Sequence, residues 1–246
     1  MGSSTYGVDV VLTKEDIDGV EDPGRKVAVV LDVIFATTTI VAALQAGARA
    51  VLPVPDLAAA RALAEGRAPG SYLLAGELNA QAFPGSWPFQ PTAMDHPKLR
   101  GRDLILATTN GTVALCRAAA FAQVYVAALS NGSAVAAHLL ARHPGQDIVL
   151  VCAGSRGRFS MEDFYGAGHL ASRLSEAGDP ARMVLGDAAL AARAAFAGSP
   201  PEAALAASRL GRLMSGRGMA ADVRYAARLD VCEVVPVYRE QEIVRA

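Results

Sequence analysis

Three polar segments follow runs of strand-forming residues, at points where helices are expected to begin. The segments are DVIFATTT (Asp32–Thr39), TTNGT (Thr108–Thr112), and CAG (Cys152–Gly154) with the later pair Glu162-Asp163. In a doubly wound α/β sheet, ligands bind outside the carboxyl ends of the parallel strands. We therefore expect the three segments to line one polar site.

Carboxylates provide the first kind of chemistry at this expected site. Their oxygens are the ligands that a hard cation such as Mg²⁺ prefers. Next to hydroxyl-rich helix starts, a bound cation would suit metal-assisted attack on an anionic ester. One alternative is that Asp163 only forms a capping box with Ser160, because the two have S-x-x-D spacing. The candidate metal ligands are Asp32, Glu77, Glu162 and Asp163.

Hydrogen-bond donors provide the second kind of chemistry at this expected site, the binding of an anion. Hydroxyls and backbone N–H groups at a helix start attract anions, and a glycine lets the backbone approach a ligand closely. Capping and turn formation are the alternative reading of the same residues. Two arginines after the third segment could reach a phosphate or a sulfonate, or lie on the surface. The candidates are Thr37, Thr38, Thr109, Asn110, Gly111, Arg156 and Arg158.

The rest of the chain alternates between β-branched runs and alanine-rich helical stretches. Strands are predicted at 8–12, 26–31, 50–54, 72–75, 104–106, 123–127, 147–151 and 232–237. Helices are predicted at 38–45, 57–65 (capped by Asp56), 112–120, 132–142, 161–175, 186–196, 201–214 and 219–229. This order predicts a three-layer α/β/α fold with a largely parallel or mixed sheet.

Two features bear on domain organisation. The change to consecutive helices places a possible lobe boundary near residues 179–186, although no flexible linker is visible there. Residues 76–101 are rich in proline and are predicted to be irregular. A loop of that length inside a compact domain is usually functional, often as a lid or a binding wall.

The composition excludes several classes of protein. Lys and Arg total 23 against 24 Asp and Glu, a net charge of −1, which argues against a sequence-independent nucleic-acid binder or an anionic-membrane surface. No run approaches the roughly 20 apolar residues of a membrane span, and residues 1–6 lack a secretory signal. The three cysteines are too far apart for a zinc site or a disulfide framework, and the four histidines lack metal-ligand spacing. We expect a cytoplasmic enzyme with a small anionic substrate and a possible homo-oligomeric state.

The same segments resemble the 2-phosphosulfolactate phosphatase family, the ComB-type enzymes of coenzyme M biosynthesis. The resemblance covers nearly the whole chain, with the motifs in the family's order. The matching elements are Asp32–Thr39, Leu74–Glu77, Thr108–Thr112, Asn131, Cys152–Gly154, Glu162-Asp163, Asp222-Val223 and Val234–Val237.

This resemblance implies a ComB-like unit over residues 1–246, for which two closely packed α/β lobes are one arrangement left open. It also implies Mg²⁺ dependence and hydrolysis of a phosphate monoester of a small anionic acid, 2-phosphosulfolactate or a related compound. By position, Asp32, Glu77 and Asp163 become candidates for catalysis or metal binding. Asn131 joins the candidates for substrate binding. Asp32 could attack phosphorus directly, or hold a metal that activates water.

The chain departs from the family pattern in two places. Phe35 stands where the family usually has arginine, and the segment after Gly76-Glu77 differs from the family's Gly-Asn-Ser-Pro. Phe35, Phe83, Trp87 and Phe89 could line an apolar pocket or pack beneath the loop. Three functions therefore stay open: a phosphatase acting on this or another phosphorylated acid, an enzyme with a different reaction, and a non-catalytic anion-binding protein.

Overall fold

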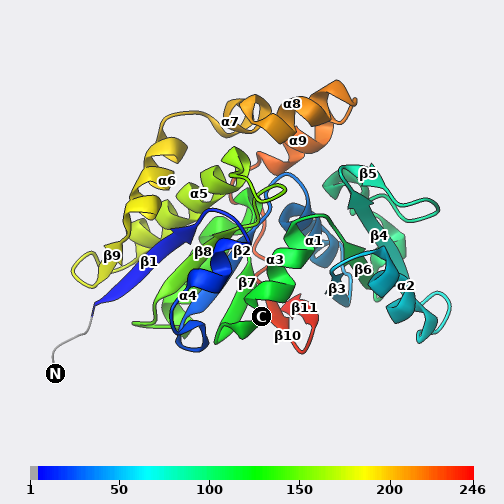
Figure 1. The fold of residues 1–246 in the computed structure, drawn as a ribbon, viewed down its shortest axis with the longest axis horizontal. Helices are drawn as coiled ribbons and strands as arrows, with labels where there is room; N and C mark the ends of the chain where they lie inside the picture. The colour runs from blue at the N-terminus through cyan, green and yellow to red at the C-terminus, as the bar shows by residue number, and fades with distance from the viewer. Residues whose placement is uncertain (1–4) are drawn as a thin grey trace.

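The computed structural model describes residues 5–246, and Figure 1 shows their arrangement. Residues 1–4, which form part of the N-terminal segment considered above for a signal, lie outside the described part. Eleven strands of the described chain form one sheet in the order β5-β4-β6-β3-β11-β10-β7-β2-β8-β1-β9. The strands are β1 (Tyr6–Val11), β2 (Val27–Leu31), β3 (Ala50–Val54), β4 (Tyr72–Leu78), β5 (Gln81–Ala82), β6 (Asp103–Ala107), β7 (Gln123–Val126), β8 (Ile148–Cys152), β9 (Met183–Leu185), β10 (Pro236–Arg239) and β11 (Glu242–Arg245).

The sheet consists of two parallel groups joined by an antiparallel hairpin. Strands β4, β6 and β3 pair in parallel, as do β7, β2, β8, β1 and β9. The hairpin β10–β11 lies between them, and it pairs antiparallel with β7 on one side and with β3 on the other. Because all three of these pairings are antiparallel, the two parallel groups have opposite sense across the hairpin.

Helices cover both faces of the sheet. One buried cluster joins α1 and α3 to one face, while another joins α4, α5 and α6 to the opposite face. The α-helices are α1 (Ala36–Gln45), α2 (Leu57–Glu65), α3 (Gly111–Arg117), α4 (Gly132–Arg142), α5 (Met161–Ala177), α6 (Asp187–Ala197), α7 (Pro201–Ala207), α8 (Arg209–Gly216) and α9 (Ala220–Ala226). Short 3₁₀ helices are η1 (Asp16–Gly19), η2 (Pro23–Arg25), η3 (Pro91–Ala93), η4 (Pro97–Leu99), η5 (Ala118–Ala120) and η6 (Leu129–Asn131). The predicted three-layer α/β/α fold with a mixed sheet is confirmed.

Local capping explains where several helices begin. The Asp56 side chain accepts a hydrogen bond of 2.8 Å from the backbone N–H of Ala59, as predicted for the start of α2. The single helix predicted at 201–214 is wrong, because Ser208 interrupts it. The Ser208 hydroxyl accepts from the N–H of Gly211 at 2.9 Å and starts a new helix, α8.

The sequence prediction missed the end of the chain. The last strand was expected at 232–237, but the chain forms the hairpin β10–β11 instead. The segment 76–101 is also less irregular than predicted, since it contains the end of β4, the short strand β5 and two 3₁₀ helices. Residues 179–186, the predicted lobe boundary, contain β9, which pairs with β1 as the edge strand of the sheet. The division of the chain into folding units stays a prediction.

Cys116, Cys152 and Cys232 are free thiols, as their wide spacing predicted. Over residues 5–246, the structure has no helix of the length and apolar character that a bilayer crossing requires.

Candidate active site

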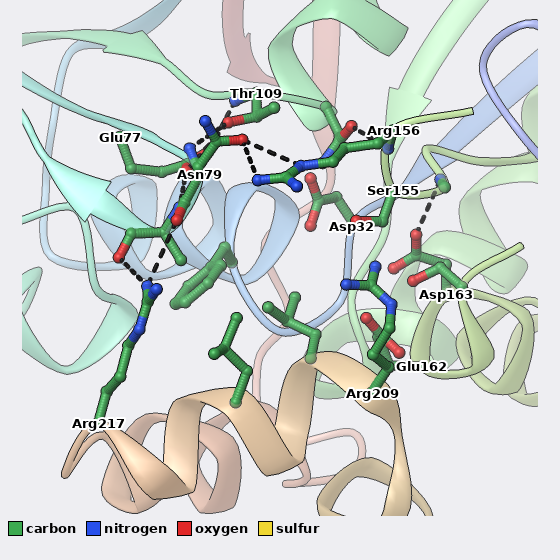
Figure 2. A pocket seen from close by; sticks show the side chains of 17 residues that line it. Asp32, Glu77, Asn79, Thr109, Ser155, Arg156, Glu162, Asp163, Arg209 and Arg217 are labelled. Atoms are coloured by element: carbon green, nitrogen blue, oxygen red, sulfur yellow. Dashed lines mark hydrogen bonds between the residues drawn. The ribbon is translucent and has the colours of Figure 1, made fainter. Parts of the chain in front are cut away.

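A small hollow lies where strands from both parallel groups end and α8 passes over them (Figure 2). Its volume of about 140 Å³ is below the range of drug-sized ligand pockets, so a small substrate is favoured. The lining residues are Asp32, Phe35, Glu77, Asn79, Ala80, Thr109, Asn110, Gly154, Ser155, Arg156, Ser160, Glu162, Asp163, Arg209, Leu210, Leu213 and Arg217. All three polar segments predicted from the sequence contribute to it.

Asp32 lies directly after β2 and is held by the first turn of α1. Its backbone N–H donates to the Thr37 hydroxyl at 3.1 Å, and that hydroxyl donates back to the Asp32 carbonyl at 3.0 Å. Burial, together with the nearby charges of Glu77 and Glu162, raises the pKa of the Asp32 carboxyl to about 7. Backbone N–H groups of Ala36 and Gly111 act in the opposite direction by stabilising the carboxylate. Asp32 is thus a buried acid in a negatively charged setting.

Asp163 joins the ends of β2 and β8. One carboxyl oxygen accepts from the N–H of Val33 at 2.9 Å, and the other accepts from the N–H of Gly154 at 3.1 Å. The capping box with Ser160 is wrong, since the Ser160 side chain forms no cap hydrogen bond at the start of α5. Burial raises the pKa of Asp163 well above its usual value, and Asp32 and Glu162 add to this rise.

Glu162 differs from the adjacent Asp163 because its carboxylate accepts no hydrogen bond from the described chain. The residue is only 2% exposed, yet no hydrogen bond or ion pair joins its side chain to another residue of the described chain. It lines the hollow beside Asp163 and Arg209 (Figure 2). A buried carboxylate without a protein partner is costly unless a cation or a donor from outside the chain satisfies it.

Glu77 fixes a turn on the other side of the hollow. Its carboxylate accepts from the N–H of Thr109 at 2.6 Å, from the N–H of Ala80 at 2.5 Å and from the Thr109 hydroxyl at 3.1 Å. Asn79 and Ala80 have positive φ values of 56° and 61°. Glu77 therefore holds the left-handed turn after β4 against the TTNGT segment.

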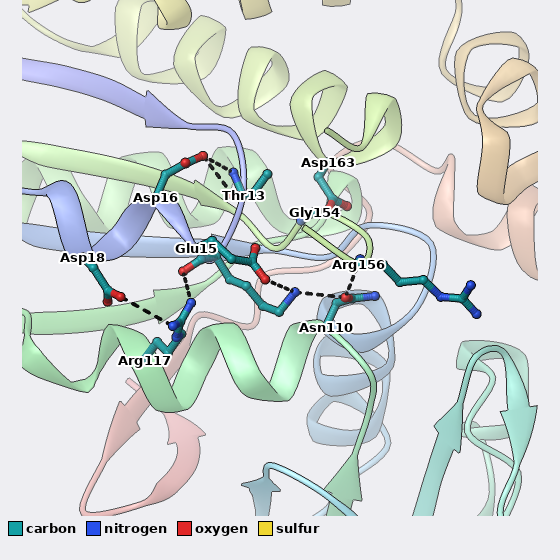
Figure 3. A network of polar contacts seen from close by, with 10 residues as sticks. Thr13, Glu15, Asp16, Asp18, Asn110, Arg117, Gly154, Arg156 and Asp163 are labelled. Carbon is teal, nitrogen blue, oxygen red and sulfur yellow. Dashed lines mark hydrogen bonds and ion pairs between the residues drawn. The ribbon is translucent and has the colours of Figure 1, made fainter. Parts of the chain in front are cut away.

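A buried lysine that the sequence analysis missed positions Asn110. Figure 3 shows the polar contacts around Asn110. Lys14 is 6% exposed, and its ammonium donates to Asn110 Oδ1 at 3.1 Å and pairs with Glu15 at 3.0 Å. The same Asn110 oxygen accepts from the N–H of Arg156 at 3.2 Å. Lys14 lies just past the end of β1. Its position shortly after a predicted strand was the signal in the sequence that could have identified it.

Three arginines reach the hollow, and two of them were also missed. Arg156 donates to Asn79 Oδ1 from Nε at 3.1 Å and from Nη2 at 2.6 Å. Arg217 donates to the carbonyls of Ala80 at 2.9 Å and Asn79 at 3.3 Å. Arg209, at the start of α8, makes no hydrogen bond or ion pair with the described chain and points toward Glu162 and Asp163 (Figure 2).

Several predicted site residues lie outside the hollow. The hydroxyl of Thr38 donates to the carbonyl of Val33 at 2.5 Å, and Thr37 is occupied with Asp32 as described. Asn131 is fully buried, where it accepts from the N–H of Ala128 and donates to the carbonyl of Val234. Gly111 packs directly against the side chain of Asp32, and Arg158 is exposed to solvent.

Of the four aromatic residues considered for an apolar wall, the hollow contains only Phe35. Phe89 packs edge-on against Phe35, with ring centroids 4.9 Å apart. Trp87 packs against His96, and Phe83 lies over a small cluster that contains Leu52 and Ile105. Packing therefore accounts for the other three rings.

Comparison with known proteins identifies the family. The sequence model of the 2-phosphosulpholactate phosphatase family matches residues 11–241. The chain belongs to this family.

Curated relatives agree with the assignment. A probable 2-phosphosulfolactate phosphatase from Carboxydothermus hydrogenoformans is 36% identical over 96% of this chain and 94% of the relative. One from Deinococcus radiodurans is 38% identical over 85% of this chain and 86% of the relative, and one from Symbiobacterium thermophilum is 34% identical over 93% and 98%. The predicted resemblance and the predicted enzyme class, a phosphoric monoester hydrolase, are confirmed at the level of the family.

The carboxylates in the hollow of this 2-phosphosulfolactate phosphatase family member can be compared with the ligands that a cation requires. Among residues 5–246, no three carboxylate, imidazole or thiol groups are clustered closely enough to hold one metal ion. Mg²⁺ does not need such a cage, because it usually takes one or two carboxylates and completes its shell with water and substrate phosphate. Asp32 and Glu162 fit that requirement, because they are buried, repel each other and form no ion pair with a cationic side chain of the described residues.

Proposed function

We propose that this protein is a Mg²⁺-dependent phosphatase that hydrolyses a phosphate monoester of a small anionic acid, 2-phosphosulfolactate or a related compound. The observation that carries the proposal is the burial of Asp32, Glu162 and Asp163 at one hollow, where no cationic side chain of residues 5–246 lies within hydrogen-bond distance of them. A divalent cation would remove this repulsion, and a phosphoryl group could complete its coordination. The names of the relatives support the phosphate ester.

The proposal gives the carboxylates distinct roles. Asp32 and Glu162 would hold Mg²⁺, which supplies Lewis-acid stabilisation of charge on the phosphoryl oxygens. Asp163 would act as a positioning residue, because both of its oxygens already accept backbone N–H bonds. Glu77 would likewise keep the Asn79–Ala80 turn and Thr109 in place.

Anion binding would come from donors on opposite sides of the hollow. Arg209 has five N–H donors and no partner in the described chain, so its guanidinium is available to an anionic group of the substrate. The Oδ1 atom of Asn110 is fixed by Lys14 and Arg156, which leaves its amide group with one orientation. These residues would orient the ester relative to Asp32.

Phosphate release tests this proposal directly. A panel of phosphorylated 2-hydroxy acids, including 2-phosphosulfolactate, would be assayed with Mg²⁺ and with a chelator in its place. We expect turnover only with the cation. Asp32→Asn is expected to abolish turnover while the protein stays folded, because an amide removes a buried charge that its surroundings disfavour.

Glu162→Gln provides the sharper test of metal binding. We expect its affinity for Mg²⁺, measured by titration calorimetry, to fall by at least about tenfold because one of two carboxylate ligands is lost. Glu176→Gln, on the exposed end of the same helix α5, is the matched control and should bind Mg²⁺ as the wild type does. Unchanged Mg²⁺ affinity in Glu162→Gln would remove Glu162 from the proposed site. If no ester is hydrolysed but anions still raise the melting temperature, the site only binds anions.

A further inference from the structure

A second cavity, of about 180 Å³, lies at the opposite ends of the strands that lead to the hollow. The hollow lies past the last residues of β2 and β8, whereas this cavity is lined by Tyr6 and Ile148, the first residues of β1 and β8. Arg182, which directly precedes β9, lines it as well. The ends of α4 and α5 complete its walls. The cavity is therefore separate from the candidate active site.

Two polar side chains at this cavity lack partners. Tyr6 is 7% exposed, yet its hydroxyl forms no hydrogen bond within residues 5–246. The Nε atom of Arg182 is buried without a hydrogen-bond partner in the described chain, and the guanidinium forms no ion pair there. Buried polar groups are nearly always hydrogen-bonded, so such exceptions call for an explanation. A ligand that accepts hydrogen bonds from both side chains would provide one.

The cavity also presents one charge of each sign. Asp179 lines it together with Arg182, and one oxygen of Asp179 accepts from the N–H of Ala181 at 2.9 Å. Burial raises the pKa of the Tyr6 hydroxyl, the charge of Arg182 lowers this pKa and the charge of Asp179 raises it, so both charges act at the same hydroxyl. Asp179 and Arg182 nevertheless form no ion pair with each other. Both charges are thus available to a ligand.

Most of the remaining lining is apolar. Leu139 and Ile148 belong to the larger core cluster and are almost fully buried. His143 contributes only the edge of its ring, because its Nε2 bonds the Tyr125 hydroxyl at 2.8 Å and its Nδ1 bonds Gln146 Oε1 at 2.7 Å. An apolar lining with a few well-placed polar groups is typical of small-molecule sites.

We infer that this cavity binds a free α-amino acid with an apolar side chain, such as leucine. The carboxylate of the ligand accepts hydrogen bonds from Arg182 and Tyr6, its ammonium group pairs with Asp179, and its side chain contacts Leu139 and Ile148. A ligand with only a negative charge would face Asp179 without compensation, and one with only a positive charge would face Arg182. The inference does not depend on the proposed function, because the two sites share no residue.

Calorimetric titration of the full chain with leucine and its analogues tests the chemistry of the ligand. Glycine, which lacks the apolar side chain, is expected to bind at least about tenfold more weakly than leucine. 3-Methylbutylamine lacks only the carboxylate of leucine and should bind at least about tenfold more weakly. 4-Methylpentanoate lacks only the ammonium group, and we expect at least about threefold weaker binding because Asp179 is exposed. No binding of leucine, or equal binding of 4-methylpentanoate, would overturn the inference.

Variants of the two charged residues test where the amino acid binds. Arg182→Gln should weaken leucine binding at least about tenfold, and Asp179→Asn at least about threefold. Both variants keep the local fold, because the carbonyl of residue 182 still accepts from the N–H of Tyr6 and an asparagine oxygen can still accept from the N–H of Ala181.

Arg142→Gln is the matched control for Arg182→Gln. Arg142 is exposed at the end of α4, next to His143, and does not line the cavity. Leucine affinity in this variant should equal that of the wild type. Wild-type affinity in Arg182→Gln, or an equal loss in Arg142→Gln, would show that leucine binds elsewhere or responds only to the overall charge, and either result contradicts the inference.

Discussion

Gly111 and Asp32 are packed so closely that no side chain fits at position 111. A Cβ atom on Gly111 would lie 2.5 Å from Asp32 Oδ2 and 2.3 Å from the Cβ of Ala36. The N–H of Gly111 also stabilises the Asp32 carboxylate. This glycine, which the sequence suggested as part of an anion cradle, lets the start of α3 pack directly against the Asp32 side chain.

Gly111→Ala is therefore expected to displace Asp32. Because misplacing a reacting or ligating group by about 1 Å can cost about 100-fold in rate, we expect a loss of that order in kcat. Overpacking should also reduce the free energy of unfolding by about 1–3 kcal/mol. Phosphate release and urea unfolding measure the two effects.

Gly66→Ala is the control, since nothing lies within 4 Å of a Cβ at that position. It should change neither activity nor stability noticeably. Full activity in Gly111→Ala would show that Asp32 can move without consequence.

At the scale of elements, α5, the start of α4 and the segment before β10 meet at Asp230. His169 on α5 bonds Asp230 at 3.0 Å, and the N–H of Ser133 on α4 donates to it at 2.7 Å. Burial alone would raise the pKa of Asp230, but the hydrogen bonds from His169 and Ser133 outweigh it and lower the pKa from 3.8 to about 2. His169 therefore has a structural role, as expected for a histidine without metal-ligand spacing.

The lowered pKa of Asp230 determines the direction in which the free energy of unfolding changes with pH. A carboxyl whose folded pKa is depressed stabilises the fold above its unfolded value and ceases to do so as pH falls through the folded value. We expect Asp230 to contribute about 1–2 kcal/mol above pH 4, decreasing between pH 4 and pH 2. Urea unfolding of the wild type and Asp230→Asn across this range measures it, with the difference between the two shrinking at low pH.

Asp22→Asn is a matched control for this change. Asp22 has nearly the same left-handed backbone as Asp230, with φ of 48° against 49°, and its exposed side chain makes no hydrogen bond in the described chain. Asparagine tolerates that conformation, so neither substitution strains the backbone. A difference between wild type and Asp230→Asn that is the same at pH 5 and pH 2 would argue against the depressed pKa.

At the scale of the whole molecule, the active site depends on a hairpin far from it. Asp32 and Asp163 follow strands of one parallel group, whereas Glu77 lies at the end of β4 and Thr109 follows β6, both in the other group. The hairpin β10–β11 is the hydrogen-bonded connection between the groups, and Val237 and Ile243 within it are fully buried. The two halves of the hollow are thus held together by the last residues of the sheet.

A chain shortened to end at residue 234 should lose this connection. Strands β3 and β7 would become unpaired edges, and we expect loss of cooperative urea unfolding and of near-ultraviolet circular dichroism. Gln241→Gly is the control, because Gln241 has φ of 67° in the hairpin turn and glycine accepts that conformation without strain. This variant should be as stable as the wild type or more so. Unchanged cooperative unfolding of the shortened chain would show that each parallel group folds without the hairpin.

Local patterns in the sequence determined much of this protein by themselves. The buried strands β3 and β6, the capped helix α2 and the helix α4 were predicted to within a residue or so, because apolar periodicity and side-chain caps act over short distances. The same reasoning predicted Asp32, Glu77, Glu162 and Asp163 as residues of one site, and all four line the hollow.

Only the tertiary structure decided how these carboxylates differ and what surrounds them. Asp163 and Glu162 are adjacent in sequence, yet one accepts two backbone hydrogen bonds and the other none, because a helix turns successive side chains by about 100°. Arg209, Leu210 and Leu213 reach the hollow because α8 returns over it from a distant part of the chain. The opposite sense of the two strand groups was equally invisible in the sequence, since pairing between distant strands depends on contacts that no local pattern encodes.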